Sequence, residues 1–121
     1  MSFFNSNPEV LQGIKIVKAD SLVAGTVTVW SPPGGNVNTR FIITDLTVMI
    51  DGGTNGTVSI YEDTLSTANL IYRFVYDNTK GAVNHHQTYN LPYVPARGKS
   101  IKIDNPSGAG VRVILHGYEA Y

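Results

Sequence analysis

The stretch Arg40-Phe41-Ile42-Ile43-Thr44-Asp45-Leu46-Thr47-Val48-Met49-Ile50 decides the fold class of this chain. It is rich in β-branched residues, which favour strands. From residue 45 onward the side chains alternate, with Leu46, Val48 and Ile50 on one side and Asp45, Thr47 and Met49 on the other. A period of two residues is typical of a strand with one buried face. The stretch therefore predicts a long β-strand that packs against a core.

Similar runs lie on both sides of this stretch. Alternation and β-propensity predict strands at residues 26–30, 57–62, 70–76, 100–104 and 111–118, and weaker ones at 14–18, 22–25 and 88–94. Segments rich in Gly, Pro, Asn and Asp separate them, and Pro92 and Pro95 suggest that residues 93–94 lie at a sheet edge. No window shows helical periodicity. About eight short strands joined by turns predict a single antiparallel β-sandwich, jelly-roll-like, over residues 13–121.

The first twelve residues differ in character from the rest. Phe3 and Phe4 stand among asparagines and serines, and Pro8 follows them. We expect residues 1–12 to form an N-terminal arm outside the sandwich. The arm is either a frayed terminus or a segment that orders on a partner, with Phe3 and Phe4 as the anchors.

Charge and composition narrow the classes of partner. The 121 residues contain nine basic and nine acidic side chains, no cysteine and no cluster of basic residues. Duplex nucleic acid is therefore not an expected partner, because its binding needs a clustered positive patch. No apolar run approaches the ~20 residues of a membrane span, and the first residues lack the features of a signal peptide. We expect no disulfides, and any export would need a route other than a signal peptide.

Three groups of residues invite a chemical interpretation. His85-His86 is interpreted as a pair of loop histidines, because adjacent histidines on a strand would chelate poorly, and His116 lies far along the chain. The loop 51–56 lacks the ligand pattern of an EF-hand. Glu62-Asp63 is not expected to form the converging carboxylate pair of a glycosidase. We therefore predict no catalytic, cofactor-binding or metal-binding residues, and no enzyme.

Aromatic residues are the remaining candidates for binding. The chain has seven tyrosines and one tryptophan, and Trp30 stands just before the Pro-Pro-Gly-Gly segment. Such side chains either fill the core of a sandwich or stack on sugars and protein partners. Tyr72, Tyr76, Tyr89 and Tyr93 lie close together in the sequence. Trp30 and Tyr93, together with Phe3 and Phe4, are the predicted partner-binding residues.

The run Thr28-Val29-Trp30-Ser31-Pro32, followed by Gly34-Gly35 and then residues 40–46, resembles small jelly-roll proteins encoded among phage structural genes. A strand like Val58–Glu62 follows in them, and they commonly end on a Gly-Tyr-Glu signature, here Gly117-Tyr118-Glu119. The likeness covers roughly residues 20–121. It implies a virion protein made in a host cytoplasm, often a head decoration or accessory fibre component and often a trimer, without catalytic residues. The arm has no counterpart in it.

Three functions follow as hypotheses. The first is a capsid decoration or accessory protein, homotrimeric, that binds the major capsid protein or another virion protein and stabilises the particle. The second is a carbohydrate- or receptor-binding module that stacks a glycan on Trp30 or Tyr93. The third is a small cupin-like enzyme with a metal on His85, His86 or His116. A balanced charge and the resemblance favour the first.

Overall fold

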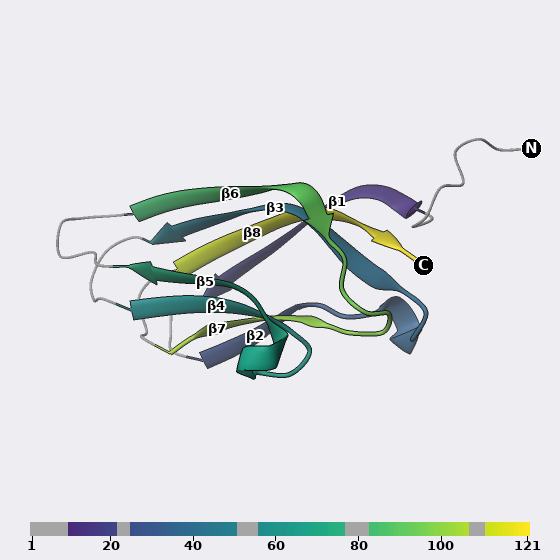
Figure 1. The fold of residues 1–121 in the computed structure, drawn as a ribbon, viewed down its shortest axis with the longest axis horizontal. Coiled ribbons are helices and arrows are strands. Elements are labelled where there is room, and N and C mark those ends of the chain that lie inside the picture. The colour runs from purple at the N-terminus through teal and green to yellow at the C-terminus, as the bar shows by residue number, and fades with distance from the viewer. Residues whose placement is uncertain (1–9, 22–24, 51–55, 77–82, 107–110) are drawn as a thin grey trace, which may run out of the picture.

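The computed structural model describes residues 10–21, 25–50, 56–76, 83–106 and 111–121. They form eight strands and two short 3-10 helices (Figure 1). The strands are β1 (Val10–Ser21), β2 (Gly25–Trp30), β3 (Arg40–Ile50), β4 (Gly56–Glu62), β5 (Leu70–Tyr76), β6 (Val83–Tyr93), β7 (Ile101–Asn105) and β8 (Val111–Ala120). The helical turns are η1 (Pro33–Gly35) and η2 (Thr67–Asn69).

The strands form two antiparallel sheets that pack face to face. Their orders are β1-β8-β3-β6 and β2-β7-β4-β5, which is the jelly-roll arrangement, and Figure 1 shows the sheets as two layers. The predicted all-β antiparallel sandwich is therefore confirmed. The strand β6 lies at an edge, as expected from Pro92, since an edge strand tolerates a residue that cannot donate to the ladder.

The structure differs from two local predictions, the loop position of His85-His86 and the length of the N-terminal arm. His85 and His86 lie within β6 rather than in a loop, because β6 pairs with the long strand β3 and their backbones stand opposite Val48 and Thr47. The strand β1 begins at Val10, so it contains the last three residues of the expected arm. Residues 1–9 lie outside the described part of the chain, and the arm stays a prediction.

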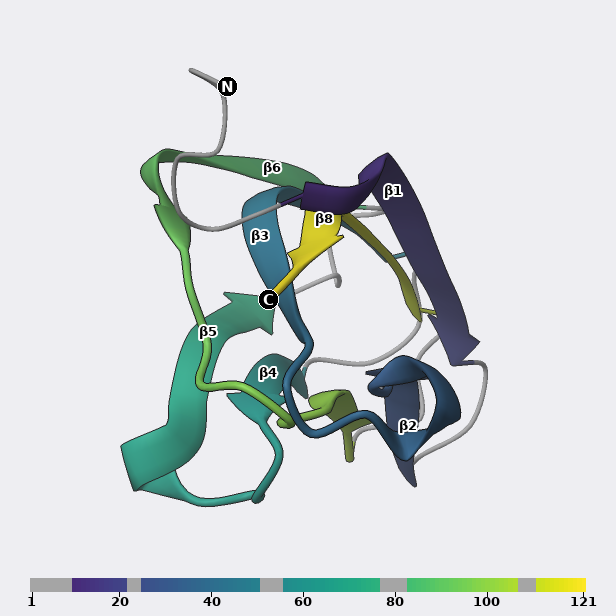
Figure 2. The same ribbon diagram turned by 90° about the vertical axis from the view of Figure 1, so that its right-hand side faces the viewer.

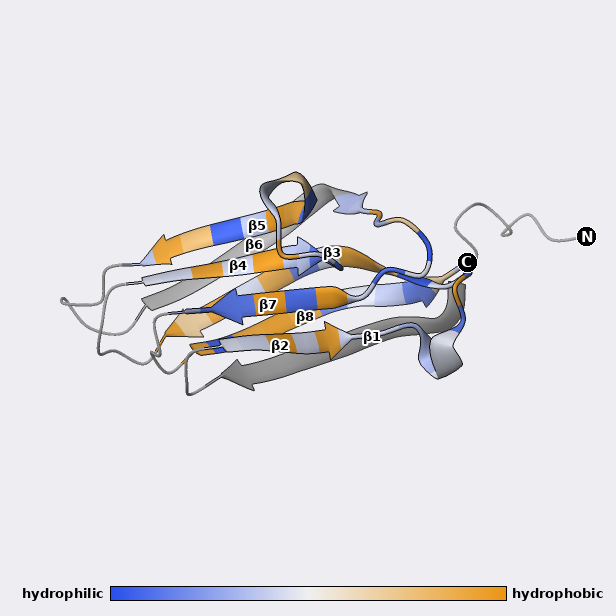
Figure 3. Ribbon diagram, turned by 90° about the horizontal axis from the view of Figure 1, so that it is seen from below, coloured by the Kyte–Doolittle hydropathy of each residue, from blue (hydrophilic) through white to orange (hydrophobic). Residues whose placement is uncertain are grey.

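The core lies between the two sheets. Leu46, Val48 and Ile50 of β3 are almost completely buried, whereas Asp45, Thr47 and Met49 are only partly so, which confirms the alternation read from the sequence. Figure 3 shows the same alternation of hydrophobic and hydrophilic residues along β7. Burying one such aliphatic side chain contributes about 1.5–3 kcal/mol. The interior face of both sheets therefore drives folding.

A β-bulge interrupts β3 at Thr44. Ile43 and Asp45 pair with the adjacent residues Gly117 and His116 of β8, so Thr44 is an additional residue in the ladder. The pairing of β3 with β6 also changes register between Ile43 and Asp45, whose partners are Tyr93 and Thr88. A bulge changes which face of the sheet the following side chains occupy. After Thr44 the side chains of β3 alternate between buried and partly exposed, whereas before it Phe41, Ile42 and Ile43 are all buried.

Gly117 is required by this bulge. A Cβ atom at residue 117 would collide with the carbonyl oxygen of Ile42 and would lie 2.9 Å from its carbonyl carbon and 3.1 Å from the Cζ atom of Phe41. Real Cβ contacts with backbone are not that short, so a larger residue would push β3 and β8 apart. The first residue of the Gly-Tyr-Glu ending therefore has a packing role.

Candidate functional site

Three connections and the C-terminal residue lie at one end of the sandwich. They are residues 31–39 between β2 and β3, residues 63–69 between β4 and β5, residues 94–100 between β6 and β7, and Tyr121. We call this set the loop end. In Figure 1 the β2–β3 and β6–β7 connections and the C-terminus lie on the right, and the β4–β5 connection lies at the lower centre; Figure 2 views the molecule from the right-hand side.

A buried contact between Trp30 and Glu119 anchors the loop end to the core. The indole Nε1–H of Trp30 donates to Oε2 of Glu119 at 2.8 Å, and the two residues are 5% and 0% exposed. The ring of Trp30 packs on Phe41 with centroids 5.9 Å apart. Through this bond the buried indole N–H has a hydrogen-bond acceptor, as buried polar groups normally do. Trp30 is thus held inside the protein, which corrects the prediction that its ring contacts a partner.

Glu62 ties the β4–β5 and β6–β7 connections together. Its Oε1 accepts the hydroxyl hydrogen of Tyr93 at 2.6 Å, and its Oε2 accepts the backbone N–H of Ala96 at 3.2 Å. Its own carbonyl oxygen accepts a hydrogen bond from the side-chain amide of Asn69 at 2.8 Å. The predicted binding residue Tyr93 therefore uses its hydroxyl to join two loops, and its ring packs against the core.

Asp63, the residue after Glu62, joins the β4–β5 connection to Ser100 at the end of the β6–β7 connection. Its φ is 64°, in the left-handed region that Asp tolerates better than most residues. Its backbone N–H donates to the carbonyl oxygen of Ser100 at 2.8 Å, and its Oδ1 accepts the hydroxyl hydrogen of Ser100 at 3.2 Å. Glu62 and Asp63 thus bind the protein's own loops and do not face each other across a cleft.

The β2–β3 connection is fixed by its own turns and by Gly98. Backbone hydrogen bonds join Gly35 to Pro32, Asn36 to Pro33 and Thr39 to Asn36. The N–H of Gly98 then donates to the carbonyl oxygen of Thr39 at 2.7 Å. Gly98 has a φ of +76°, and a Cβ there would lie 2.8 Å from the carbonyl oxygen of Val37. All three connections are therefore linked into one rigid surface.

Four exposed apolar side chains lie on the segments of the loop end. Among the described residues, five large hydrophobic residues are exposed, and four of them belong to the loop end: Val37 (70%), Leu65 (47%), Val94 (47%) and Tyr121 (44%). The fifth, Val75 (71%), lies on β5. Arg97 and Lys99 are exposed on the same β6–β7 connection as Val94. The exposed apolar side chains of the loop end are candidates for contact with a protein partner.

The described tyrosines between residues 72 and 93 do not form an exposed platform. Tyr76 is buried, and Tyr72 and Tyr93 are half-buried and pack against the core. Burial raises the pKa of Tyr72 above its ordinary value because the phenolate would lose solvation. The side chain of Tyr89 lies outside the described part of the structure. Tyr72, Tyr76 and Tyr93 therefore belong to the core and its margin, one of the two roles that the sequence left open.

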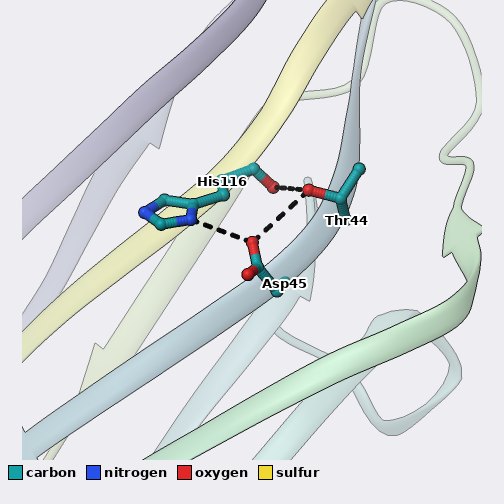
Figure 4. A network of polar contacts seen from close by, with 3 residues as sticks. All are labelled: Thr44, Asp45 and His116. Carbon is teal, nitrogen blue, oxygen red and sulfur yellow. Dashed lines mark hydrogen bonds and ion pairs between the residues drawn. The ribbon is translucent and has the colours of Figure 1, made fainter.

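A second polar cluster lies on the outer face of the β1-β8-β3-β6 sheet. Nδ1 of His116 lies 3.0 Å from Oδ1 of Asp45, and the two side chains are 38% and 21% exposed (Figure 4). The hydroxyl of Thr44, the bulged residue, donates to the carbonyl oxygen of His116 at 3.0 Å and lies 3.4 Å from Oδ1 of Asp45. The bulge at Thr44 therefore positions Asp45 and His116 next to each other. No motif in the sequence predicted this contact.

The other residues predicted as binding or metal-ligating candidates are Phe3, Phe4, His85 and His86. Phe3 and Phe4 lie outside the described residues, as do the side chains of His85 and His86. Within the residues that the structure describes, no group of three or more His, Cys, Asp or Glu side chains could hold a metal ion, and no pocket is found. Nor does that part of the chain contain a helix with the length and apolar character of a membrane span.

No protein-family model and no curated protein matches the sequence of this chain. Solved structures match it by fold. A chain from the capsid of Helicobacter pylori bacteriophage KHP30 has a TM-score of 0.56 at 14% identity, over 89% of this chain and 87% of its own. A chain from the disulfide-linked pili of Bacillus endospore appendages has a TM-score of 0.51 at 12% identity, over 99% and 95%.

Carbohydrate-binding modules are also among the similar structures. A family 6 module is 12% identical over 86% of this chain and 93% of its own, with a TM-score of 0.42. That score is too low to support a functional argument. Taken together, the likenesses show a jelly-roll-like fold that this chain shares with capsid and pilus chains.

Proposed function

We propose that this chain is a non-enzymatic structural protein of a virion, which docks on the assembled particle and stabilises it. The observation that carries the proposal is the rigid loop end with its exposed apolar side chains. A surface held by internal hydrogen bonds loses little conformational entropy on binding, so it is suited to docking. The fold shared with a phage capsid chain is compatible with such an assembly.

The finer proposal is a bacteriophage capsid decoration or accessory protein that binds the major capsid protein. The resemblance in the Trp30-Ser31-Pro32 and Gly117-Tyr118-Glu119 segments supports it, and the structure gives these segments a shared role, because Trp30 and Glu119 are bonded to each other. We also propose that copies associate as a homotrimer. A disulfide-linked fibre is not proposed, since the 121 residues contain no cysteine.

The alternative of a glycan-binding module is less well supported. It requires exposed aromatic rings, and Trp30 is buried while the hydroxyl of Tyr93 is bonded to Glu62. A screen of purified chain against a broad glycan array tests this alternative. Saturable binding that is lost on Tyr93→Ala, in a variant that keeps its fold, would favour the alternative over the virion proposal.

Counting copies on particles tests the proposed function. Gradient-purified virus particles from the source are analysed by quantitative mass spectrometry, with the major capsid protein as the internal standard. The decoration proposal predicts hundreds of copies per particle, in a fixed ratio to the capsid lattice. A few copies would place the chain at a tail or vertex, and absence from the particles would contradict a virion role.

A further inference from the structure

The strand β5 forms an outer edge of the β2-β7-β4-β5 sheet. Among the described strands it is hydrogen-bonded to β4 alone, and Figure 2 shows it at one side of its sheet. An antiparallel strand directs the N–H and C=O groups of every second residue to one side, so an edge strand presents a row of backbone donors and acceptors. The partner that such a row recognises is another extended backbone.

The other three edge strands differ from β5 in sequence. β1 contains Lys15 and Lys18, and β6 contains Pro92, which cannot donate a backbone hydrogen bond. β2 exposes Thr26 and Thr28 instead of apolar side chains. Lysines and prolines on edge strands are common protection against pairing with another chain. β5 has the sequence Leu-Ile-Tyr-Arg-Phe-Val-Tyr, with neither proline nor glycine and with a single charge.

The single charge of β5 is bonded to its own sheet. Nε of Arg73 donates to Oγ of Ser59 at 3.1 Å, and its Nη2 donates to the hydroxyl oxygen of Tyr61 at 3.3 Å. Both acceptors belong to β4, on the inner side of β5, so the guanidinium is directed away from the outer edge. Val75 is 71% exposed, the highest value among the exposed large hydrophobic residues of the described chain. The outer edge of β5 is therefore apolar and has no charge that would oppose pairing.

We propose that β5 pairs through its outer edge with β5 of a second copy of this chain, antiparallel and about a two-fold axis. An apolar edge without a charge is complemented by an edge of the same kind, and nine basic and nine acidic side chains give two copies no net repulsion. A register centred on Arg73 would place two arginines opposite each other, which is unfavourable. A register centred on Phe74 instead places Arg73 opposite Val75 of the other copy.

This inference goes beyond the proposed function and does not depend on it. A two-fold contact joins two copies and cannot close a ring of three, so the proposed homotrimer would use a different surface. The pair forms between chains in solution and persists on particles. Docking on a particle therefore leaves the environment of Val75 as it is in the unbound chain.

Sedimentation velocity of the purified chain over a wide range of concentrations tests the proposal. The wild-type chain should dimerise reversibly. Val75→Lys should raise the dissociation constant of the dimer at least about tenfold, because it places a lysine at the paired edge of both copies. Val37→Lys is the matched control: Val37 is 70% exposed and lies in the β2–β3 connection, so the same added charge should leave the dimer unchanged. Thermal unfolding verifies that both variants keep the fold.

Two further measurements test whether the contact is a pair of strands. Backbone amides of β5 should exchange hydrogen more slowly in the dimer than in the dilute monomer, whereas those of the edge strand β2 should not change. The chain has no cysteine, so an introduced thiol can be cross-linked without background. In the register centred on Phe74 the two copies of residue 75 are diagonal neighbours, about 7–8 Å apart. A short bis-maleimide should therefore link Val75→Cys into a dimer far more efficiently than Val37→Cys.

Three results would overturn the proposal. A chain that stays monomeric at every concentration would do so, and protection of the β5 amides on particles alone would then assign the edge to a strand of a virion partner. A dimer that Val75→Lys leaves unchanged would place the contact on another surface. A dimer that Val75→Lys weakens without protection of the β5 amides would limit the contact to side chains. None of these results changes the number of copies on particles, which tests the proposed function separately.

Discussion

The two faces of β8 use carboxylates in different ways. On the inward face, Glu119 is fully buried and accepts the indole hydrogen of Trp30. On the outward face, His116 meets Asp45 while both side chains keep contact with solvent. A buried acceptor cannot be removed without leaving a donor unsatisfied, whereas an exposed pair is screened and exchanges its partner for water. The comparison indicates that the inward face fixes the fold and the outward face contributes little to stability.

The largest expected effect is that of Gly117→Ala. The added methyl group meets the carbonyl group of Ile42, and backbone at a strand pair cannot move aside without breaking the ladder. We expect a loss of about 3 kcal/mol or more in the free energy of unfolding, measured by urea denaturation. The control is Gly35→Ala, where φ is +72° but no atom lies within 4 Å of the added Cβ, and where about 1 kcal/mol is expected.

Equal effects of these two substitutions would contradict the explanation. They would mean that the conformational freedom of glycine matters at both positions and that the close approach at Gly117 does not. A crystal structure of Gly117→Ala with an unchanged bulge at Thr44 would lead to the same conclusion.

The next largest effect concerns the buried carboxylate itself. Glu119→Ala removes the acceptor of the Trp30 indole hydrogen and leaves a cavity, so we expect a loss of about 2–4 kcal/mol. Glu119→Gln keeps an oxygen at the same position and should cost clearly less. The measurement is urea unfolding followed by tryptophan fluorescence, which reports on the only tryptophan of the chain. A smaller loss for Glu119→Ala than for Glu119→Gln would contradict the assigned contact.

The strands with alternating side chains could be predicted from the sequence, because the two-residue period of a strand can be recognised from neighbouring residues alone. Leu46, Val48 and Ile50 were recognisable as core residues from their own neighbours. The contact between Trp30 and Glu119 was not, because it joins residues 89 positions apart. The close approach of β3 to β8 explains the glycine of the Gly-Tyr-Glu ending, and the contact of β8 with Trp30 of β2 explains the glutamate.

The candidate site was predictable only in part. Tyr93 was identified as a binding residue, whereas its hydroxyl joins two loops through Glu62. Val37 and Val94 carried no signal, since a single valine in a loop has no periodicity. Their importance arises from the hydrogen bonds that hold three distant loops in one surface, and such bonds depend on the tertiary structure.

The smallest expected effect is that of breaking the outward pair. His116→Ala, Asp45→Asn and the double variant form a double-mutant cycle at neutral pH. Because both side chains are partly exposed, we expect a coupling energy below about 1 kcal/mol. A coupling energy as large as the loss in Glu119→Ala would remove the difference between the two faces of β8.

Hydroxyl-radical footprinting of the particle-bound chain tests the central claim most directly. Rates of side-chain oxidation are measured by mass spectrometry for the free chain and for the chain on particles. Docking through the loop end predicts strong protection of Leu65, Val94 and Tyr121, with Val75 on β5 and Met49 on β3 oxidised at the rates of the free chain. Protection of Val75 or Met49 with an unprotected loop end would contradict the account and place the contact on a sheet face.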